Sequence, residues 1–300
     1  MQHVLITGAN GFVGAYLVTE LLSRNFFVIA TGKGESRLPV HSDNFKYASL
    51  DFTNDEEVTA LFKKYKPSIV IHSGAMSKPD ECELNREAAF RTNVSGTTNL
   101  LSKAETLKSF FIFLSTDFVF SGTKDIYRED DTDTFPVNYY GETKFLAEQE
   151  VRKYQHGWAI VRTVLVYGKP LQNRHNILTN TANALRRLES LRIFNDQVRT
   201  PTYVRDLANG IATIAEKSAR GIFHISGKDV ITPYEIALAV AEHLNLDTSL
   251  ISKVTWNDFQ QPARRPAKTI FDITKAKTEL DYAPISFKEG LRRTFSDDPE

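Results

Sequence analysis

The stretch TGANGFVG, residues 7–14 of the 300-residue chain, decides the fold. It follows an apolar run of strand type, His3–Thr7, and leads into a helix-type pattern over Ala15–Leu22. A second apolar run, Phe26–Ala30, comes next. A strand, a glycine turn, a helix and a second strand are the context in which such a motif indicates dinucleotide binding. The sequence therefore predicts an α/β fold with a Rossmann-type, doubly wound parallel sheet and a cofactor site at this turn.

The glycines of this turn have distinct expected roles. Gly8 permits the tight turn, Gly11 lets the backbone approach a pyrophosphate, and Gly14 lets the helix pack on the strand. The helix N-terminus then offers amide N–H groups and a positive dipole to the phosphates. A glycine-rich loop without a ligand is the plain alternative, which the order of the elements disfavours. The cofactor-binding candidates in the turn are Gly8, Asn10, Gly11, Phe12, Val13 and Gly14.

The end of the second predicted strand should select the cofactor. An NAD enzyme usually carries an acid there, which binds the ribose 2′-hydroxyl. In this chain Thr31 or Gly32 fills that position, and Lys33 and Arg37 follow. These cations favour a 2′-phosphate, so we expect NADP(H) in preference to NAD(H). In the alternative interpretation Lys33 and Arg37 are solvated and Glu35 reaches the ribose.

Two further predicted strands, Phe45–Leu50 and Ser68–Ile71, also end in candidate residues. Asp51 and Phe52 follow the first, and His72 follows the second, where we expect it to be packed and hydrogen-bonded. Small residues beyond it suit a cofactor, because ligands of open parallel sheets lie outside the strand C-termini. These small residues are Ser73, Gly74 and Ala75.

Two segments with weaker patterns come next. Met76–Asn85 is predicted to be an irregular loop, and its place after a strand C-terminus favours the substrate side. A solvated loop is the alternative. Glu87–Ser109 is predicted to be one long helix, which carries Asn93.

Tyr140 and Lys144 are expected one turn apart near the start of a helix, so their side chains project from the same face. The cation favours the phenolate and should lower the tyrosine pKa from about 10, and a shift of two or three units asks roughly 3–4 kcal/mol. Alone the spacing is weak, because a chain with 11 tyrosines contains roughly one Tyr-x-x-x-Lys by chance. The glycine turn and a nearby hydroxyl give it weight.

That hydroxyl belongs to Thr116, at the end of Phe110–Leu114, which is apolar throughout, as a buried parallel strand should be. A hydroxyl there can donate to a carbonyl oxygen on which charge develops, whereas Ser115 points the other way. Capping of the backbone is the alternative role, which the company of Tyr140 and Lys144 disfavours. The candidate catalytic residues are Thr116, Tyr140 and Lys144.

Composition argues against several classes of protein. Lys plus Arg and Asp plus Glu both number 37, and the zero net charge argues against a general nucleic-acid or membrane-surface binder. No apolar run approaches the roughly 20 residues of a membrane span. The single cysteine, Cys82, excludes an internal disulfide framework and fits a reducing compartment. Since the sequence starts with a strand-like segment and not a signal peptide, we expect a cytoplasmic protein.

The chain resembles the extended short-chain dehydrogenase/reductase family, in which Thr-Gly-x-x-Gly-x-x-Gly is the usual glycine turn. Blocks along the whole chain are most similar to dTDP-4-dehydrorhamnose reductases. Ser115–Gly122 resembles their Ser-Thr-Asp-Tyr-Val-Phe-x-Gly block, and Tyr140–Lys144 has their form. Val198–Thr200 departs from their aromatic-Gly-small pattern, so Arg199 would change the sugar or nucleotide accepted. The later similar blocks are Asn195–Gln197, Pro201–Tyr203, Asp206–Ala208, Arg265-Pro266, Asp272 and Leu280.

The resemblance implies NADPH-dependent reduction of the C4 keto group of a nucleotide-linked 6-deoxy sugar. Tyr140 would donate the proton, Thr116 would bind the same oxygen, and Lys144 would hold the nicotinamide ribose. Asp51 would meet the adenine amino group, and Asn93, grouped with the cofactor residues, would have a structural role behind the active site. A nucleotide-sugar epimerase or dehydratase is one alternative. The non-catalytic regulatory subunit of methionine adenosyltransferase, which is also similar, is another.

The pattern changes from Val166 onward, where helices and short strands alternate and arginines are frequent. We expect a dinucleotide-binding domain of residues 1–165 and about 203–218, and a smaller α/β substrate domain of residues 166–202 and 219–300. Arginine makes bidentate contacts with phosphate, which suits a nucleotide-sugar diphosphate, although a surface charge is the alternative for any one arginine. The substrate-binding candidates are Asp117, Asn176, Arg199 and Arg265.

The loop after the Thr116 strand carries an acidic run, Glu129–Asp133. Such a run is usually solvated surface, so no metal site is expected, and a magnesium site is the less favoured alternative. A homodimer is left open, and no nucleic-acid or membrane partner is expected.

Overall fold

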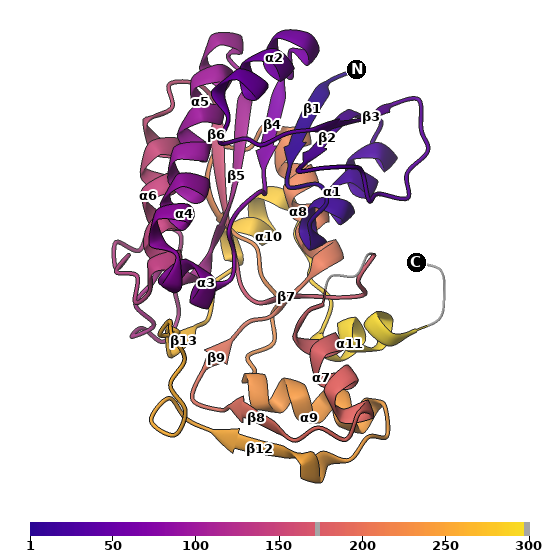
Figure 1. Cartoon of the computed structure of the whole chain (residues 1–300), viewed down its shortest axis with the longest axis vertical. Helices are drawn as coiled ribbons and strands as arrows, with labels where there is room; N and C mark the ends of the chain where they lie inside the picture. Colours follow the sequence, from indigo (N-terminus) through magenta and orange to yellow (C-terminus); the bar gives the residue numbers. More distant parts are fainter. Residues whose placement is uncertain (172–174, 297–300) are drawn as a thin grey trace.

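The structure is a computed structural model that describes residues 1–171 and 175–296. Its centre is a seven-stranded parallel sheet with the order β11-β6-β5-β4-β1-β2-β3 (Figure 1). This order confirms the Rossmann-type fold, because the strand sequence reverses between β1 and β4. The strands are β1 (His3–Thr7), β2 (Phe27–Gly32), β3 (Phe45–Ser49), β4 (Ile69–His72), β5 (Phe110–Thr116), β6 (Trp158–Thr163) and β11 (Gly221–His224).

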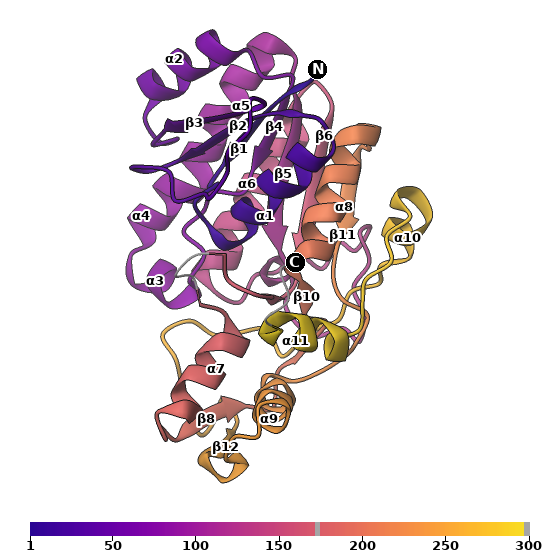
Figure 2. The ribbon, with the colours of Figure 1, turned by 90° about the vertical axis from the view of Figure 1, so that its right-hand side faces the viewer.

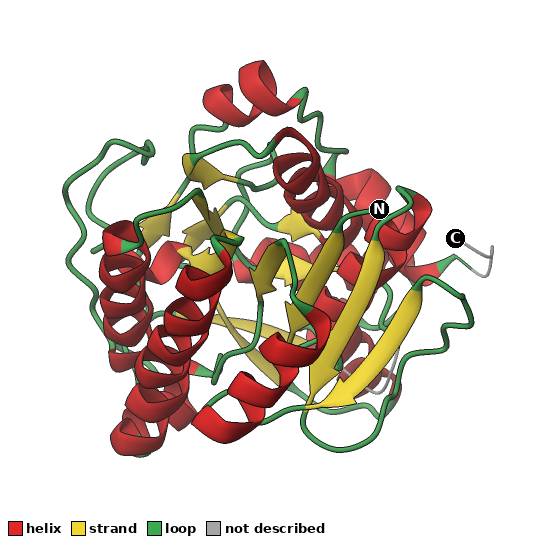
Figure 3. Ribbon diagram, turned by 90° about the horizontal axis from the view of Figure 1, so that it is seen from above, coloured by secondary structure: helices red, strands yellow, loops and turns green. Residues whose placement is uncertain are grey.

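Helices cover both faces of this sheet (Figures 2 and 3). One face carries α1 (Phe12–Ser23) and α8 (Val204–Lys217), which contact each other, and the other carries α2 (Asp55–Tyr65), α5 (Gly96–Leu107) and α6 (Tyr139–Lys153). Strand side chains alternate between the two layers: Val4 and Ile6 pack with Leu17, while Leu5 packs with Leu100. The segment after Tyr203 forms α8, which also contacts β5 and β6.

The region below the sheet in Figure 1 is built around a parallel pair, β8 (Leu191–Phe194) and β12 (Ile251–Val254), packed on α7 (Ile177–Arg186) and α9 (Pro233–His243). Short parallel pairs connect it to the sheet domain. These are β7 (Val166–Tyr167) with β10 (Thr202–Tyr203), and β9 (Val198–Arg199) with β13 (Lys268–Thr269). The described residues also form the short 3-10 helices η2 (Asp117–Val119) and η3 (Thr248–Leu250) and the helix α11 (Phe287–Phe295).

The domain boundary differs from the expected one near residue 219. Strand β11 pairs with β6 as the edge of the sheet, and α10 (Thr274–Leu280) packs against α8 and β11. Both segments were expected in the substrate region. Both are short. Strand β11 attaches by pairing with β6, about sixty residues earlier, and α10 attaches by packing on α8 and β11, and no local sequence pattern contains these contacts.

Two segments before β5 also differ from expectation. The predicted loop Met76–Asn85 contains a short helix, α3 (Pro79–Leu84), which begins with proline at its first position. The predicted single helix over residues 87–109 is divided into α4 (Arg86–Phe90), a π-helical turn η1 (Arg91–Ser95) and α5. Asn93 lies in this π turn, and such turns are frequent at functional sites.

None of the described helices is long and apolar enough to cross a bilayer. Among residues 1–171 and 175–296, no three or more His, Cys, Asp or Glu side chains are grouped so that they could hold a metal ion. Within the acidic run, Asp131 pairs with Lys124, and Glu129 accepts a hydrogen bond from the His224 amide.

Candidate active site

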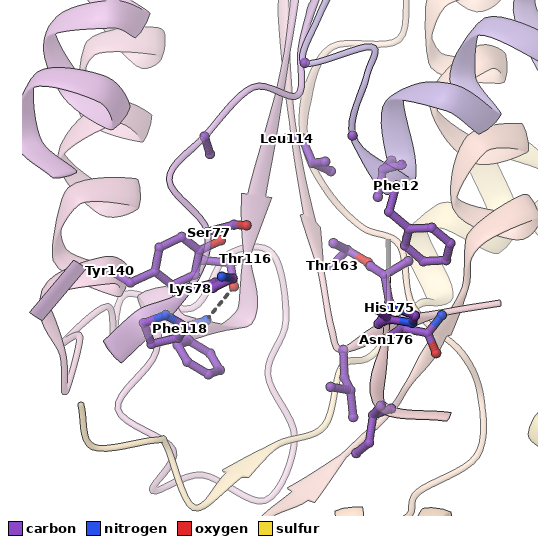
Figure 4. Close-up of a pocket in the computed structure, with 18 of the residues that line it drawn as sticks. Phe12, Ser77, Lys78, Leu114, Thr116, Phe118, Tyr140, Thr163, His175 and Asn176 are labelled. Atoms are coloured by element: carbon purple, nitrogen blue, oxygen red, sulfur yellow. Dashed lines mark hydrogen bonds between the residues drawn. The ribbon is translucent and has the colours of Figure 1, made fainter. Parts of the chain in front are cut away.

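A cavity of about 1320 Å³ lies at the C-terminal ends of the sheet strands and extends to α7 and β8. Every catalytic, cofactor-binding and substrate-binding candidate of the sequence analysis lines it except Asn93. Figure 4 shows Tyr140, Thr116 and Lys78 on one side of this space, and Phe12 and Asn176 on the other. The structure therefore brings the glycine turn, the catalytic candidates and the substrate candidates to one cavity.

The glycine turn forms a cradle that only glycine can make. Gly8 has φ of +71°, and a Cβ there would lie 2.7 Å from Gly74 Cα. A Cβ on Gly11 or Gly14 would lie 2.9 or 2.3 Å from the Gly8 carbonyl oxygen. Helix α1 follows at once, with no side chain capping its N-terminus and no acid in its first turn. Such an open helix N-terminus fits a diphosphate.

Asn10 fastens the loop that follows β2. Its side-chain amide donates to the Glu35 carbonyl oxygen and the Tyr47 hydroxyl, at 2.9 and 2.8 Å, and its Oδ1 accepts from the Arg37 amide at 3.0 Å. The Lys33 ammonium lies 2.7 Å from the Asp51 carboxylate. Lys33 and Arg37 thus line the cavity from a loop that Asn10 holds in place. Asp51 pairs with Lys33 of this loop.

Tyr140 and Lys144 lie in the first turns of α6, whose N-cap, Asn138, accepts from the Gly141 amide at 2.9 Å. Burial raises the pKa of Tyr140 well above its usual value, and a hydrogen bond with Thr116 opposes the rise. Burial also lowers the pKa of Lys144 to about 7, although the negative charge of Glu148 acts to raise it. The expected lowering of the tyrosine pKa is therefore wrong for this structure, because desolvation is the largest influence on this phenol and it raises the pKa.

Thr116 ends β5, and its hydroxyl is already engaged. It donates to Asp117 Oδ1 at 3.1 Å and accepts from the Phe118 amide at 3.2 Å, the contact drawn in Figure 4. Thr116 therefore caps the backbone, which was the alternative role in the sequence analysis. It also lies beside Tyr140. The hydroxyl of Ser115 donates to the Glu148 carboxylate instead.

Asp117 and Arg199 form a buried pair between the two regions. Arg199 Nε lies 3.8 Å from Asp117 Oδ2, which also accepts from the Thr269 hydroxyl at 2.6 Å. Arg199 donates to the carbonyl oxygens of Pro266 and Ala267, at 2.6 and 3.3 Å. Burial raises the pKa of Asp117 and lowers that of Arg199, while each charge stabilises the other. Arg199 therefore holds the cavity wall through backbone contacts.

Arg265 and Asn176 are also held by protein groups. The Arg265 guanidinium makes a bidentate contact with Asp80 in α3, at 2.6 and 2.7 Å. This contact joins the substrate-side loop to the smaller region, and the carboxyl pKa of Asp80 is lowered by it. Asn176 caps α7 by accepting from the Leu178 amide at 3.1 Å, and donates to the Gly168 carbonyl oxygen at 2.7 Å.

Two polar residues lie behind the cavity wall. The Asn93 side chain contacts the Met76 backbone and donates to the Thr143 hydroxyl at 3.0 Å, so it is placed behind the site. His72 is 1 % exposed and hydrogen-bonded through both ring nitrogens, as the sequence predicted.

Several cavity residues were not singled out from the sequence. Phe118 packs edge-on against Tyr140 with ring centroids 5.8 Å apart, and Lys78 lies in the loop before α3. Arg187, Arg192 and Gln197 line the far end, next to α7 and β8. Lys78 could have been predicted as a cavity residue, because it follows the C-terminal end of a strand. The positions of Arg187, Arg192 and Gln197 depend on how the smaller region folds over the sheet.

Comparison with known proteins gives three results. A protein-family model described as RmlD substrate binding domain matches residues 1–298. Methionine adenosyltransferase 2 subunit beta of Mus musculus is 31 % identical over 299 residues, which cover 98 % of this chain and 87 % of that protein. The spore coat polysaccharide biosynthesis protein SpsK of Bacillus subtilis is 30 % identical, with 97 % and 96 % covered.

Among solved structures, dTDP-4-dehydrorhamnose reductase from Bacillus anthracis in complex with NADP superposes with a TM-score of 0.84. The identity is 27 %, and the match covers 98 % of this chain and 99 % of that one. The family match spans nearly the whole chain and agrees with the sheet order and the glycine cradle. The chain therefore belongs to the RmlD substrate binding domain family, among the extended short-chain dehydrogenase/reductase-like proteins.

Proposed function

We propose that this protein is an NADPH-dependent reductase of the 4-keto group of a nucleotide-linked 6-deoxy sugar. The observation that carries the proposal is the shared cavity, in which the glycine cradle and the side chains of Thr116, Tyr140 and Lys144 line one space. The likeness to the Bacillus anthracis reductase, whose structure contains NADP, supports it.

The residues present fit a dinucleotide. The cradle of Gly8, Gly11 and Gly14 would hold the diphosphate at the N-terminus of α1. Lys33 and Arg37 would bind a ribose 2′-phosphate, for which the Asp51 carboxylate would release the Lys33 ammonium. When bound, NADPH supplies the hydride that the reaction needs.

Tyr140 would act as the proton donor. Burial keeps its phenol protonated at neutral pH, so the proton is available for the oxygen on which charge develops. Lys144 places its ammonium in the same cavity, where a cation stabilises the phenolate that forms. The Thr116 hydroxyl would assist by turning from Asp117 to the substrate oxygen, since it has only one proton to donate.

The substrate end of the cavity would take the nucleotide diphosphate. Arg265 shows the bidentate geometry that a phosphate also accepts, and its partner Asp80 is partly exposed and replaceable. Asn176 and Asp117 also line the cavity, where Asp117 would help to orient the sugar. Arg199, fixed by backbone carbonyl groups, would shape the site without contacting phosphate. A homodimer and a cytoplasmic location stay predictions.

The deciding experiment follows absorbance at the NADPH wavelength with a dTDP-4-keto-6-deoxyhexose, and repeats it with NADH. We expect consumption of NADPH that depends on the sugar, and a slower rate with NADH. Turnover of a nucleotide sugar without net consumption of NADPH would instead indicate an epimerase or dehydratase. Equal rates with both nucleotides would contradict the cofactor preference alone.

A second function has a specific observation in its favour. Methionine adenosyltransferase 2 subunit beta matches this chain over almost its whole length, so a cofactor-binding subunit without turnover is the alternative. Tight binding of NADPH, with no consumption in the presence of any 4-keto nucleotide sugar, would favour that function. Tyr140 and Lys144 would then line a binding site only.

A further inference from the structure

We propose that a one-directional chain of buried hydrogen bonds ties the glycine turn to the backbone of Tyr140, with His72 as the positioning residue at its centre. The proposal rests on the proposed role of Tyr140, although the chain itself is a structural feature. The residues before Tyr140 in this chain are all buried, with exposed fractions of 0–1 %. From donor to acceptor the chain passes through Thr7, His72, Thr97, Asn93, Thr143 and Tyr140.

The direction of the first half follows from counting protons. The Thr97 hydroxyl lies 2.6 Å from the Asn93 carbonyl oxygen, which can only accept, so Thr97 donates its one proton there. His72 Nε2, 3.0 Å from the same hydroxyl, must then donate to it. His72 Nδ1 therefore carries no proton and accepts from the Thr7 hydroxyl at 2.6 Å. The contacts on both sides fix one tautomer, with the proton on Nε2.

The surroundings keep this imidazole neutral. Its ring packs against Phe52, Phe111 and Phe113, with centroids at 5.0, 6.3 and 5.7 Å. Burial lowers the pKa of His72 well below its usual value, and the nearby charge of Lys144 lowers it further. A protonated ring would need an acceptor for a second N–H, and the Thr7 hydroxyl would then have to turn away.

The second half of the chain is directed in the same way. The Thr143 hydroxyl donates to the Tyr140 carbonyl oxygen at 2.9 Å, so it must accept from the Asn93 amide at 3.0 Å. The same Asn93 amide also donates to the Met76 carbonyl oxygen at 3.0 Å, while its oxygen accepts from the Met76 amide at 2.8 Å. Asn93 makes these contacts from the π turn η1. Its carbonyl oxygen accepts the hydrogen bond from the Thr97 hydroxyl.

The two ends of the chain lie in opposite parts of the active site. The Thr7 hydroxyl accepts from the Gly74 amide at 3.3 Å, and the Thr7 carbonyl oxygen accepts from the Ser73 hydroxyl at 2.7 Å. Thr7 is therefore hydrogen-bonded to two of the candidate cofactor-binding residues that line the cavity. Thr143 holds the first turn of α6, which carries the Tyr140 phenol. The chain thus sets the distance between the cofactor seat and the proton donor, and small errors in such a distance are costly in rate.

The test uses three single substitutions on α5. Thr97→Val keeps the shape of the side chain and removes the hydroxyl, whereas Thr97→Ser keeps the hydroxyl. Thr98→Val is the matched control, because the exposed Thr98 donates to the Val94 carbonyl oxygen at 3.1 Å in the same i to i−4 manner without touching His72. The full-length chain is used throughout.

The first readout is NMR of the His72 ring and of the backbone amides, which needs no activity. In the wild type we expect a neutral ring protonated on Nε2 at neutral pH, because burial lowers the pKa of His72 well below its usual value. Thr97→Val should shift the amide signals of both Gly74 and Thr143, and Thr98→Val neither. A ring protonated on Nδ1, a ring that titrates near its usual pKa, or shifts confined to α5 would each overturn the chain.

The second readout is turnover. We expect Thr97→Val to lower kcat about tenfold with KM for NADPH changed less than about threefold, and Thr97→Ser to keep kcat within about twofold. An unchanged kcat in Thr97→Val, with the expected ring and amide signals, would overturn the positioning role of His72. A wild type that reduces no nucleotide sugar would contradict the proposed function instead, and the NMR results would still decide on the chain.

Discussion

The ammonium nitrogen of Lys144 lies 3.9 Å from the centre of the Phe113 ring, at the wall of the active-site cavity. The side chain is almost fully buried, and no described residue accepts a hydrogen bond from this nitrogen. A ring face compensates only part of the hydration that a buried cation loses, so the pKa of Lys144 falls to about 7. This group is therefore poised to change charge within the working range of pH.

That position predicts a pH dependence of stability. An unfolded lysine keeps its proton up to about pH 10.4, whereas Lys144 in the fold loses it near 7, so between these values the unfolded state binds more protons. Stability should then rise with pH, by at most about 1.4 kcal/mol per unit. Urea unfolding of the wild type and of Lys144→Met between about pH 6 and 9 measures it. Parallel curves for the two proteins would contradict the prediction.

Replacement of Tyr140 by phenylalanine tests the proton donor. The change removes one hydroxyl at a position where the ring already packs against Phe118, so the fold should be kept. We expect kcat to fall at least about a hundredfold, because no other phenol lines the cavity wall in the described residues, with the NADPH Kd changed less than about threefold. Steady-state kinetics and fluorescence titration of NADPH give the two values. Full turnover in this variant would remove Tyr140 from the chemistry.

The cofactor preference depends on two cations after β2. The double variant Lys33→Ala, Arg37→Ala should raise the Kd of NADPH about tenfold or more and that of NADH less than about threefold, because only NADPH carries the 2′-phosphate. A matched control is Lys63→Ala, Lys64→Ala, which removes two exposed charges from the end of α2, outside the cavity. If both nucleotides weaken equally, the cations serve the loop and not the phosphate.

The sheet was predictable because its buried strands are apolar runs with glycine or small residues at their C-terminal ends. Phe110–Leu114 corresponds to most of β5, and the turn at Gly8 follows β1 as expected. Strand β11 was missed because only Ile222 and Phe223 are apolar in it and its pairing with β6 is a tertiary contact. The π turn at Asn93 depends on hydrogen bonds to other segments, so residues 87–109 show only a helical pattern.

The site was predictable where residues follow strand ends, since those ends meet at one edge of a parallel sheet. The partners of the arginines were not predictable. Arg265 binds Asp80, which lies 185 positions earlier, and Arg199 faces Asp117 from another region. The direction of the Tyr140 pKa shift was missed for a similar reason: the sequence places Lys144 one turn away, but the extent of desolvation depends on the whole cavity.

Glu148 of α6 and Arg162 of β6 form an ion pair in which neither side chain is exposed to solvent. The guanidinium donates to both carboxylate oxygens, at 2.9 and 2.7 Å, and the Ser115 hydroxyl adds a third hydrogen bond at 2.6 Å. Arg162 Nη1 has no hydrogen-bond partner within the described part of the chain. The pair also acts on the site, because the charge of Glu148 favours the protonated form of Lys144.

Glu148→Gln should therefore lower the free energy of unfolding by about 3–5 kcal/mol, since it leaves the Arg162 charge buried without its counter-ion. The double variant Glu148→Leu, Arg162→Met should recover most of this loss, because an apolar pair of similar size leaves no buried charge. Glu150→Gln, which breaks the exposed pair with Lys153 on the same helix, is the control and should cost less than about 1 kcal/mol. Urea denaturation of the four proteins measures the differences. A Glu148→Gln variant as stable as the control would show that water reaches Arg162 and replaces the carboxylate.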